Sequence, residues 1–279
     1  MKVAVFDFDG TLHHPGVGIA AADIAALRAW REAGHVSMCA TGRSRSKLAR
    51  GLAGAEGLFD FHVLSNGSAA TTVDDQLLYT HPVPNHVLVE AVARFGTTPG
   101  LAVCGTTWGD NDAIFADTTA DLSVEDGRDL IAGFTTMSAD DIPDHDFALL
   151  VFWLPHTAAT TPANTTEIIA WAEAHPEVNY ARNANFVDVM APGRDKAAGI
   201  IDVLAHLGHD RADVELYTFG DSWNDLPMHA IADVSHSFPY SPADVQSATN
   251  HVVDSVGETL LSYLSCLLYT SDAADDSLR

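Results

Sequence analysis

The chain has 279 residues, of which 47 % are hydrophobic and 19 % are charged, so it can form one large domain or two smaller ones and is too apolar to be disordered. Acidic residues outnumber basic ones 38 to 14, which gives a formal net charge of −24. A field of this sign argues against nucleic-acid binding and against docking on anionic membranes, but it leaves room for a small phosphorylated ligand where positive charge is concentrated.

The cysteine content and the length of the apolar runs indicate the cellular compartment of the protein. Cys39, Cys104 and Cys266 are too widely spaced for a zinc signature, and an odd number offers no disulfide framework. We therefore expect a reducing, cytoplasmic setting. We also expect a monomer or weak homodimer. The longest apolar runs, at 147–154 and about 260–269, are shorter than the ~20 residues that a membrane span needs.

The first 80 residues alternate between short apolar strands and helices. Strands are predicted at 2–8, 36–40 and 62–65, and helices at 20–33 and 44–52. This alternation predicts an α/β fold with a parallel sheet and right-handed crossovers. Each predicted strand ends in small polar residues, at the edge where ligands bind to such sheets.

The middle of the chain has a different pattern. Residues 81–187 hold more strands and turns, including a buried strand at 147–154 and a helix at 166–175, and we interpret them as an inserted α+β domain. Seven acidic residues lie between 110 and 129. We interpret them as a solvated face rather than a second metal site.

The strand–helix alternation returns after residue 188. A helix is predicted at 194–207, a strand at 214–219, and two short strands near 234 and 252. Residues 1–80 and 188–265 are therefore predicted to form one core domain. The last segment, 266–279, fits neither pattern and resembles translated sequencing-adapter read-through, so we expect the native chain to end near residue 265.

Two aspartates follow the first predicted strand, in Asp7-Phe8-Asp9-Gly10-Thr11. Residues two apart in a regular strand point to one face, and two buried carboxylates are costly without a partner. Mg²⁺ suits this place, because it prefers oxygen ligands and uses few protein carboxylates. The alternative is a solvated turn that happens to contain Asp-Gly.

The second predicted strand ends in Thr41-Gly42-Arg43. A hydroxyl, a backbone N–H and a guanidinium just before a helix are suitable donors for a phosphate group. The alternative is a capped helix with a basic, solvent-facing side, since three more basic residues follow before residue 51.

Two further stretches carry candidate chemistry. Lys196 opens a predicted helix, where its charge opposes the helix dipole and suggests a functional reason; a lone surface lysine is the alternative. The stretch 220–228 follows the strand at 214–219 and supplies Asp221, Asn224 and Asp225. An N-cap role would explain one of these two acids but not both.

Taken together and in this order, the stretches resemble the motifs of the haloacid dehalogenase-like (HAD) hydrolase superfamily, most closely its Cof-type sugar-phosphatase branch. The matching elements are Asp7-x-Asp9-Gly10-Thr11, Thr41-Gly42-Arg43, Asn66-Gly67, Lys196 and Gly220 to Met228. The resemblance covers about residues 1–260. It implies a Rossmann-like parallel-sheet core, with the insert at 81–187 acting as an α+β cap that contacts the substrate.

The resemblance also implies an aspartyl-phosphate route. Asp7 would attack phosphorus, and Asp9 would be general acid and then general base. Lys196 would reduce the repulsion between Asp7 and the phosphate. Mg²⁺ would be held by Asp7, by the backbone carbonyl of Asp9 and by Asp221, with Asp225 completing or supporting the site. The expected phosphate- and substrate-binding residues are Thr41, Gly42, Arg43, Asn66, Asn224 and Arg182.

The function implied is a Mg²⁺-dependent phosphatase of small phosphorylated metabolites, foremost sugar phosphates. A phosphosugar mutase on the same scaffold is one alternative and would need a bisphosphate activator. A non-catalytic metabolite-binding protein is another, although the intact Asp7, Asp9, Lys196 and Asp221 argue against it. For Arg182, which lies in the insert, the alternative is a polar hairpin turn.

Overall fold

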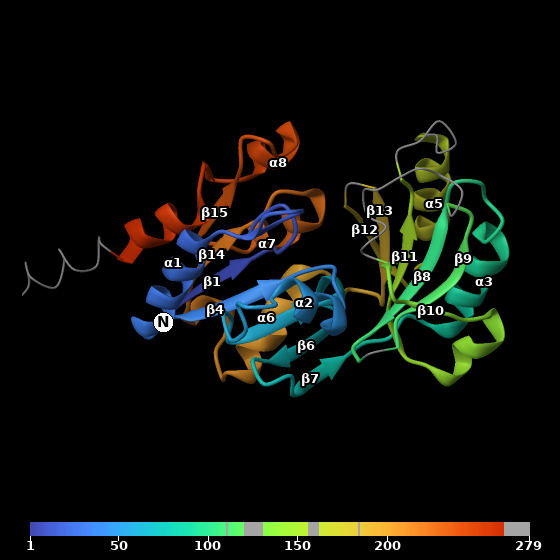
Figure 1. Cartoon of the computed structure of the whole chain (residues 1–279), viewed down its shortest axis with the longest axis horizontal. Coiled ribbons are helices and arrows are strands. Elements are labelled where there is room, and N and C mark those ends of the chain that lie inside the picture. Colours follow the sequence, from blue (N-terminus) through green and yellow to red (C-terminus); the bar gives the residue numbers. More distant parts are fainter. Residues whose placement is uncertain (110, 120–130, 156–161, 184, 265–279) are drawn as a thin grey trace, which may run out of the picture.

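The computed structural model describes residues 1–109, 111–119, 131–155, 162–183 and 185–264. Two sheets, each with its own helices, lie side by side (Figure 1). Most of the acidic stretch at 110–129 and all of the tail at 266–279 lie outside the described residues.

The larger sheet has eight strands in the order β16-β15-β14-β1-β4-β5-β6-β7. The strands from β16 to β5 run parallel, and β6 and β7 are antiparallel additions at one edge. The bounds are β1 (Lys2–Phe6), β4 (Val36–Ala40), β5 (Phe61–Leu64), β6 (Ala69–Thr72), β7 (Leu77–Thr80), β14 (Glu215–Phe219), β15 (Val234–Ser237) and β16 (His251–Val252).

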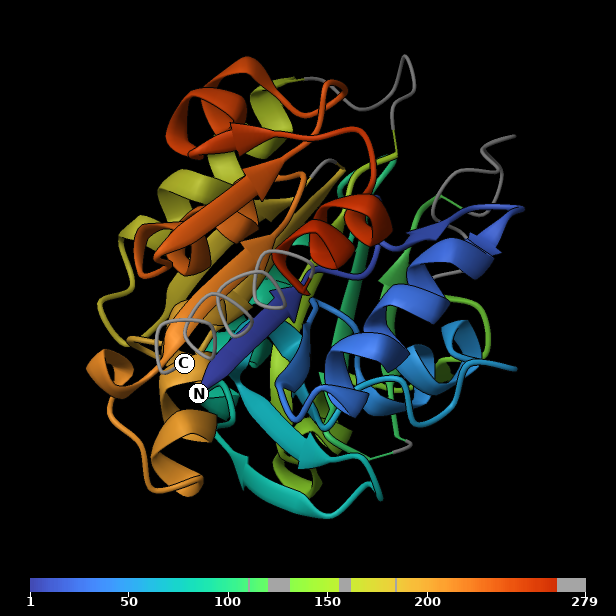
Figure 2. The same cartoon turned by 90° about the vertical axis from the view of Figure 1, so that its left-hand side faces the viewer.

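Strand β1 lies at the point where the strand order reverses. The chain proceeds from β1 to β4 and β5 on one side, and returns to β14, β15 and β16 on the other. In Figure 2 the orange-to-red strands of this second half fan out from the blue strand β1. Such a reversal opens a crevice at the carboxyl ends of the strands, where ligands bind.

Both faces of the larger sheet are buried. Residues of β1 alternate between the two core clusters: Ala4 and Phe6 pack with Trp30 of α1, whereas Val3 and Val5 pack with Ile200 of α6. Coverage on both sides explains why β1 is continuously apolar rather than alternating. The helices of this part are α1 (Ala21–Glu32), α2 (Arg45–Gly51), α6 (Lys196–His206), α7 (Leu226–Ala230) and α8 (Ala243–Ala248).

The smaller sheet has the order β10-β9-β8-β11-β13-β12. Its strands are β8 (Ala102–Thr107), β9 (Ala113–Asp117), β10 (Thr135–Thr136), β11 (Phe147–Trp153), β12 (Asn179–Asn183) and β13 (Phe186–Met190). Helices α3 (Asn85–Phe95) and α5 (Pro162–Glu173) pack on one face through a shared core cluster. Figure 1 shows α3 on the side away from the larger sheet, so the opposite face is turned toward it.

Shorter elements lie between these strands and helices. They are the hairpin β2 (His13–His14) and β3 (Gly18–Ile19), and the 3₁₀ helices η1 (Ser65–Gly67), η2 (Ala139–Asp144), η3 (Arg211–Asp213) and η4 (Trp223–Asp225). Within the described part of the chain, every helix is too short or too polar to cross a bilayer.

The predicted fold class, α/β with a parallel-sheet core, is confirmed. Two of the differences from the sequence-based expectation bear on the site and on the boundary of the insert. Strand β1 ends at Phe6 rather than at residue 8. Asp7 and Asp9 therefore lie beyond the strand, and the alternation of side chains in a regular strand does not determine where they point. Strand β13 runs past residue 187 to Met190, so it crosses the boundary expected between insert and core.

Candidate active site

Three buried or half-buried carboxylates meet at the crevice. Asp7 follows β1 directly, and Asp221 lies just beyond β14, whose last residue pairs with the last residue of β1. Asp225 closes the short helix η4. Single oxygen atoms of the three side chains lie within 4.8 Å of one another.

Lys196 is fully buried beside these carboxylates. It is the first residue of α6, which Asp195 caps by accepting a hydrogen bond from the backbone N–H of Ala198. Its Nζ donates to Oδ1 of Asp7 and to Oδ1 of Asp225, both at 2.6 Å. The alternative of a lone surface lysine is therefore wrong: helix α6 directs the ammonium inward to the carboxylates.

Asp225 has a different role from its two neighbours. Its Oδ1 is bonded to Lys196, and its Oδ2 accepts the backbone N–H of Ser222 at 2.9 Å. Asp7 and Asp221 line a cavity of about 380 Å³ between the two sheets, whereas Asp225 does not. Asp225 therefore holds the lysine, and the other two carboxylates face the ligand space.

One ammonium cannot neutralise three carboxylates. Burial raises the pKa of Asp7 well above its usual range, and the charges of Asp225 and Asp221 add to this effect. Burial, followed by the charge of Asp225, raises the pKa of Asp221 to about 7. Burial lowers the pKa of Lys196, but Asp225 and Asp7 raise it by more, so the amine stays charged.

The excess negative charge fits a divalent cation. Asp7 and Asp221 present carboxylate oxygens, which are the ligands that Mg²⁺ prefers. Thr11 orients Asp221 by donating its hydroxyl to Oδ1 at 3.1 Å. Gly10 has φ +86°, and a Cβ there would lie 2.6 Å from the Asp221 carboxylate, so only glycine allows this close approach.

Asp9 is not part of the cluster of Asp7, Asp221 and Asp225, although it lines the same cavity as Asp7 and Asp221. Arg43 grips it with two hydrogen bonds of 2.6 Å, from Nε and Nη2, and the guanidinium lies 4.8 Å from the ring centre of Phe8. Burial raises the pKa of Asp9, but hydrogen bonds and charge from His13 and Arg43 outweigh it, so the net pKa lies below the usual value. Arg43 thus binds Asp9 in this structure, and its predicted contact with phosphate stays a prediction.

The segment after β4 lines the same cavity. Thr41 and Gly42 are among the lining residues, and the Thr41 hydroxyl accepts the backbone N–H of Arg43 at 3.1 Å. Lys47 is also buried, and its Nζ donates to the backbone carbonyl of Ala132 in the insert at 2.6 Å. The alternative of a basic, solvent-facing helix is therefore wrong for Arg43 and Lys47.

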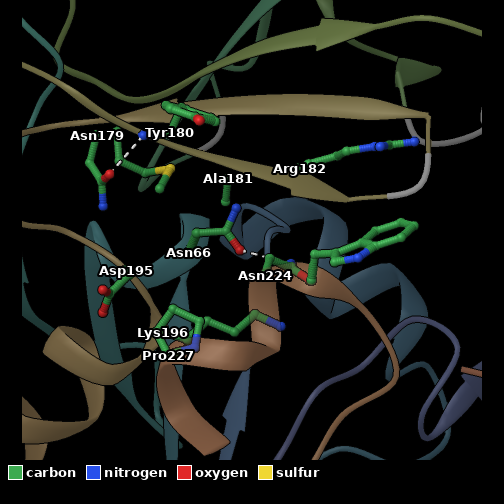
Figure 3. Close-up of a pocket in the computed structure, with 11 residues that line it drawn as sticks. Asn66, Asn179, Tyr180, Ala181, Arg182, Asp195, Lys196, Asn224 and Pro227 are labelled. Atoms are coloured by element: carbon green, nitrogen blue, oxygen red, sulfur yellow. Dashed lines mark hydrogen bonds between the residues drawn. The ribbon is translucent and has the colours of Figure 1, made fainter. Parts of the chain in front are cut away.

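Asn66 joins the two parts of the molecule. It lies in a run of three residues with positive φ, Ser65 to Gly67. Its Nδ2 donates to Oδ2 of Asp188 at 2.7 Å. Its Oδ1 accepts from Nδ2 of Asn224 at 3.1 Å, and Figure 3 draws this second bond. Sequence reasoning missed Asp188, although a single acid inside the apolar run Phe186 to Met190 was a usable signal.

Arg182 lies elsewhere. A neighbouring cavity of about 430 Å³ is lined by Arg182, Trp223, Asn224 and Lys196, among other residues (Figure 3). The guanidinium lies 4.7 Å from the ring centre of Trp223. Arg182 is therefore not among the residues that line the cavity of Asp7 and Asp221, and its role toward a substrate stays a prediction.

The fold and the site together define an α/β protein whose parallel strands end in an acidic cluster around a buried lysine. The family model for haloacid dehalogenase-like hydrolases matches residues 4–259. The chain therefore belongs to the haloacid dehalogenase-like hydrolase family, and the predicted superfamily is confirmed. No curated protein sequence matches the chain.

Solved structures with this fold include the HAD subclass IIB sugar phosphatase BT4131, with TM-score 0.77 and 21 % identity over 94 % of this chain and 99 % of that one. The HAD phosphatase BT1666 from Bacteroides thetaiotaomicron has TM-score 0.73 and 19 % identity over 94 % and 92 %. A haloacid dehalogenase-like hydrolase from B. subtilis has TM-score 0.78 and 14 % identity over 95 % and 98 %. At 14–21 % identity these neighbours show a shared fold, and the Cof-type branch expected from the motifs stays a prediction.

Proposed function

We propose that this protein is a Mg²⁺-dependent phosphatase of small phosphorylated metabolites, foremost sugar phosphates. The observation that carries the proposal is the buried Lys196, which bridges Asp7 and Asp225 beside Asp221 at the end of the parallel strands. This arrangement supports a role of Asp7 as the nucleophile, because the carboxylate lies next to the charged amine of Lys196. Family membership supports hydrolase chemistry, and one structural neighbour is described as a sugar phosphatase.

In the first step, a carboxylate oxygen of Asp7 attacks phosphorus, and the bond between phosphorus and the ester oxygen breaks. Asp9 gives a proton to that leaving oxygen. In the second step, water attacks the aspartyl phosphate, Asp9 takes its proton, and phosphate leaves. Lys196 holds the nucleophile and offsets the repulsion between carboxylate and phosphate. Mg²⁺ held by Asp7 and Asp221 would supply further charge neutralisation.

The two hydrogen bonds from Arg43 to Asp9 affect both steps of the reaction. A carboxylate with a lowered pKa suits the second step, in which Asp9 accepts a proton. The first step needs a protonated Asp9, so the hydrogen bonds from Arg43 to Asp9 must weaken when the ester is bound. Thr41 and the backbone of Gly42 remain available as donors to the phosphoryl oxygens in the same cavity.

The setting is part of the proposal. Cys39 and Cys104 are buried free thiols, which supports a reducing compartment such as the cytoplasm. The proposed partner is a small phosphorylated metabolite, and the proposed state is a monomer or weak homodimer.

The test is phosphate release from a panel of sugar phosphates, nucleotides and cofactor phosphates, with Mg²⁺ or with EDTA. We expect Mg²⁺-dependent release, concentrated on a few sugar phosphates. Asp7→Asn keeps the shape of the side chain but removes the nucleophile, so we expect no turnover and an unchanged circular dichroism spectrum. Retained turnover in this variant would refute the nucleophile assignment. No release from any ester by folded wild-type protein with Mg²⁺ would refute the phosphatase.

A further inference from the structure

Asp188 lies in apolar surroundings on the smaller sheet. It is the middle residue of β13, and its register partners are Val151 on β11 and Ala181 on β12. Phe186 and Met190, two positions to either side on β13, belong to the apolar cluster on this face. Only 4 % of Asp188 is exposed, and a buried carboxyl costs free energy unless a suitable partner compensates it.

Among the described residues, the hydrogen-bond partner of Asp188 compensates the cost of burying its carboxyl only weakly. The neutral amide of Asn66 donates one hydrogen bond of 2.7 Å to Oδ2. Burial raises the pKa of Asp188 to about 7, against smaller opposing effects of Asn66 and Lys196. An asparagine would satisfy Asn66 equally well without the cost of burying an acid. Stability therefore does not explain the carboxyl, which favours a functional reason.

The carboxyl reaches the ligand space of the site. Asp188 lines the same cavity as Asp7 and Thr41, and its Oδ2 lies 3.4 Å from the point that a Cβ on Gly42 would occupy. It therefore lies beside the proposed phosphate position, on the side of the smaller sheet. A carboxyl group there is not a phosphate ligand, because two anions repel. It can accept a hydrogen bond from a neutral hydroxyl.

The rest of this wall suits the same ligand. Four apolar side chains of the insert line the cavity on this side: Ile131, Phe134, Val151 and Phe186. A sugar presents C–H surfaces as well as hydroxyls, and an apolar wall with one well-placed acceptor matches both. Asn66 fixes one oxygen of Asp188, and Asn224 in turn fixes Asn66. The acceptor is thus held in place before the ligand arrives.

We propose that Asp188 is a specificity-determining residue that accepts a hydrogen bond from a hydroxyl of the leaving group, so that the site prefers polyhydroxylated phosphate esters to aryl ones. This assignment rests on the proposed function, because a leaving group exists only if the cavity takes a phosphate ester. Asp188 takes no part in the bond changes at phosphorus.

The test compares two esters in wild type and Asp188→Asn. One is the best-hydrolysed member of a panel of hexose and pentose phosphates, and the other is p-nitrophenyl phosphate, whose leaving group has no further hydroxyl. Asparagine keeps an acceptor for Asn66 but loses the ionisable acceptor. We expect kcat/KM to fall about tenfold or more for the sugar phosphate, mainly through KM, and to change by less than about twofold for the aryl ester.

Asp112→Asn is the matched control. Asp112 is another buried carboxylate of the insert, and it accepts hydrogen bonds from the hydroxyls of Ser44 at 2.6 Å and Ser46 at 2.9 Å. Its loss weakens docking of the insert onto α2, so both esters should suffer by the same factor. An equal effect of Asp188→Asn on the two esters, or no effect on either, would overturn the specificity assignment.

If the protein is not a phosphatase, the two esters give a result that differs from every outcome above. Wild-type protein would then hydrolyse neither ester, and titration calorimetry with Mg²⁺ would decide the assignment of Asp188. The ligands are the same sugar phosphates and phenyl phosphate. We expect Asp188→Asn to lose affinity only for the sugar phosphates. Unchanged or equally reduced affinities, or no binding by wild type, would overturn the assignment without any measurement of turnover.

Discussion

Arg43 and Asp9 form the most consequential side-chain pair outside the carboxylate cluster. The guanidinium is planar and binds both oxygens of Asp9, which a single ammonium could not do. Both residues line the cavity, and Arg43 helps to hold the pKa of Asp9, the proposed general acid and base, below its usual value. Arg43 therefore tunes Asp9 whether or not it also contacts phosphate.

Replacing Arg43 by alanine should move the pH dependence of catalysis. Burial still raises the pKa of Asp9, and the opposing effect of Arg43 is gone, so the pKa rises. The first step needs the protonated acid, and we therefore expect the basic limb of kcat/KM on a sugar phosphate to shift upward by about one pH unit or more. Arg43→Lys keeps the charge and should shift less. An unmoved limb in Arg43→Ala would contradict the role of Arg43.

At the scale of elements, the turn at Ser65–Gly67 decides how β5 meets α6. Gly67 has φ +88°, and a Cβ there would lie 1.9 Å from the backbone carbonyl oxygen of Asp195. That carbonyl belongs to the N-cap of the helix that carries Lys196. The tight approach explains why an Asn-Gly pair follows this strand, and it couples the turn to the position of the lysine.

Gly67→Ala should therefore lower both stability and turnover. We expect a loss of about 2 kcal/mol or more in the free energy of unfolding, measured by urea denaturation, because the left-handed backbone and the steric contact both penalise alanine. Gly54→Ala is the matched control: Gly54 has φ +84° but no atom within 4 Å of its added Cβ. It should cost only about 1 kcal/mol and spare turnover. Equal losses in the two variants would show that the contact with Asp195 is unimportant.

Secondary structure near the site was largely predictable. The strand expected at 36–40 is β4 to the residue, and the helix expected at 44–52 is α2 within one residue at each end. The helix expected at 194–207 begins two residues later, because Asp195 takes the N-cap position. The predicted length of strand β1 was too great, because the apolar Phe8 extends the sequence pattern past the point where the strand ends.

At the scale of the whole molecule, the burial and clustering of the site carboxylates make the stability depend on pH. The pKa of Asp221 rises from 3.8 to about 7 on folding, so the folded state holds a proton that the unfolded chain releases between these pH values. The contribution of Asp221 to stability is thus largest at low pH and is lost as the pH rises through 7. Mg²⁺ must displace such protons to bind.

We therefore expect the gain in unfolding free energy caused by Mg²⁺ to increase from pH 5 to pH 8. The measurement is denaturant unfolding at several pH values, with Mg²⁺ or with EDTA. Asp221→Asn removes a proposed metal ligand and should abolish most of the gain at every pH. A gain that does not change with pH, or that persists in Asp221→Asn, would contradict a magnesium site at these carboxylates.

The amino-acid sequence by itself determined the class of fold, the family and most of the groups around the site. Candidate site residues follow closely after strands in the chain, so local patterns suffice to locate Asp7, Thr41 and Asp221. Only the tertiary structure decided which of these groups touch. Lys196 bonds to a residue 189 positions away, and Asn66 to one 122 positions away. The first contact depends on how α6 packs on the larger sheet, and the second on how the two sheets pack. Local periodicity holds no information about packing between distant segments.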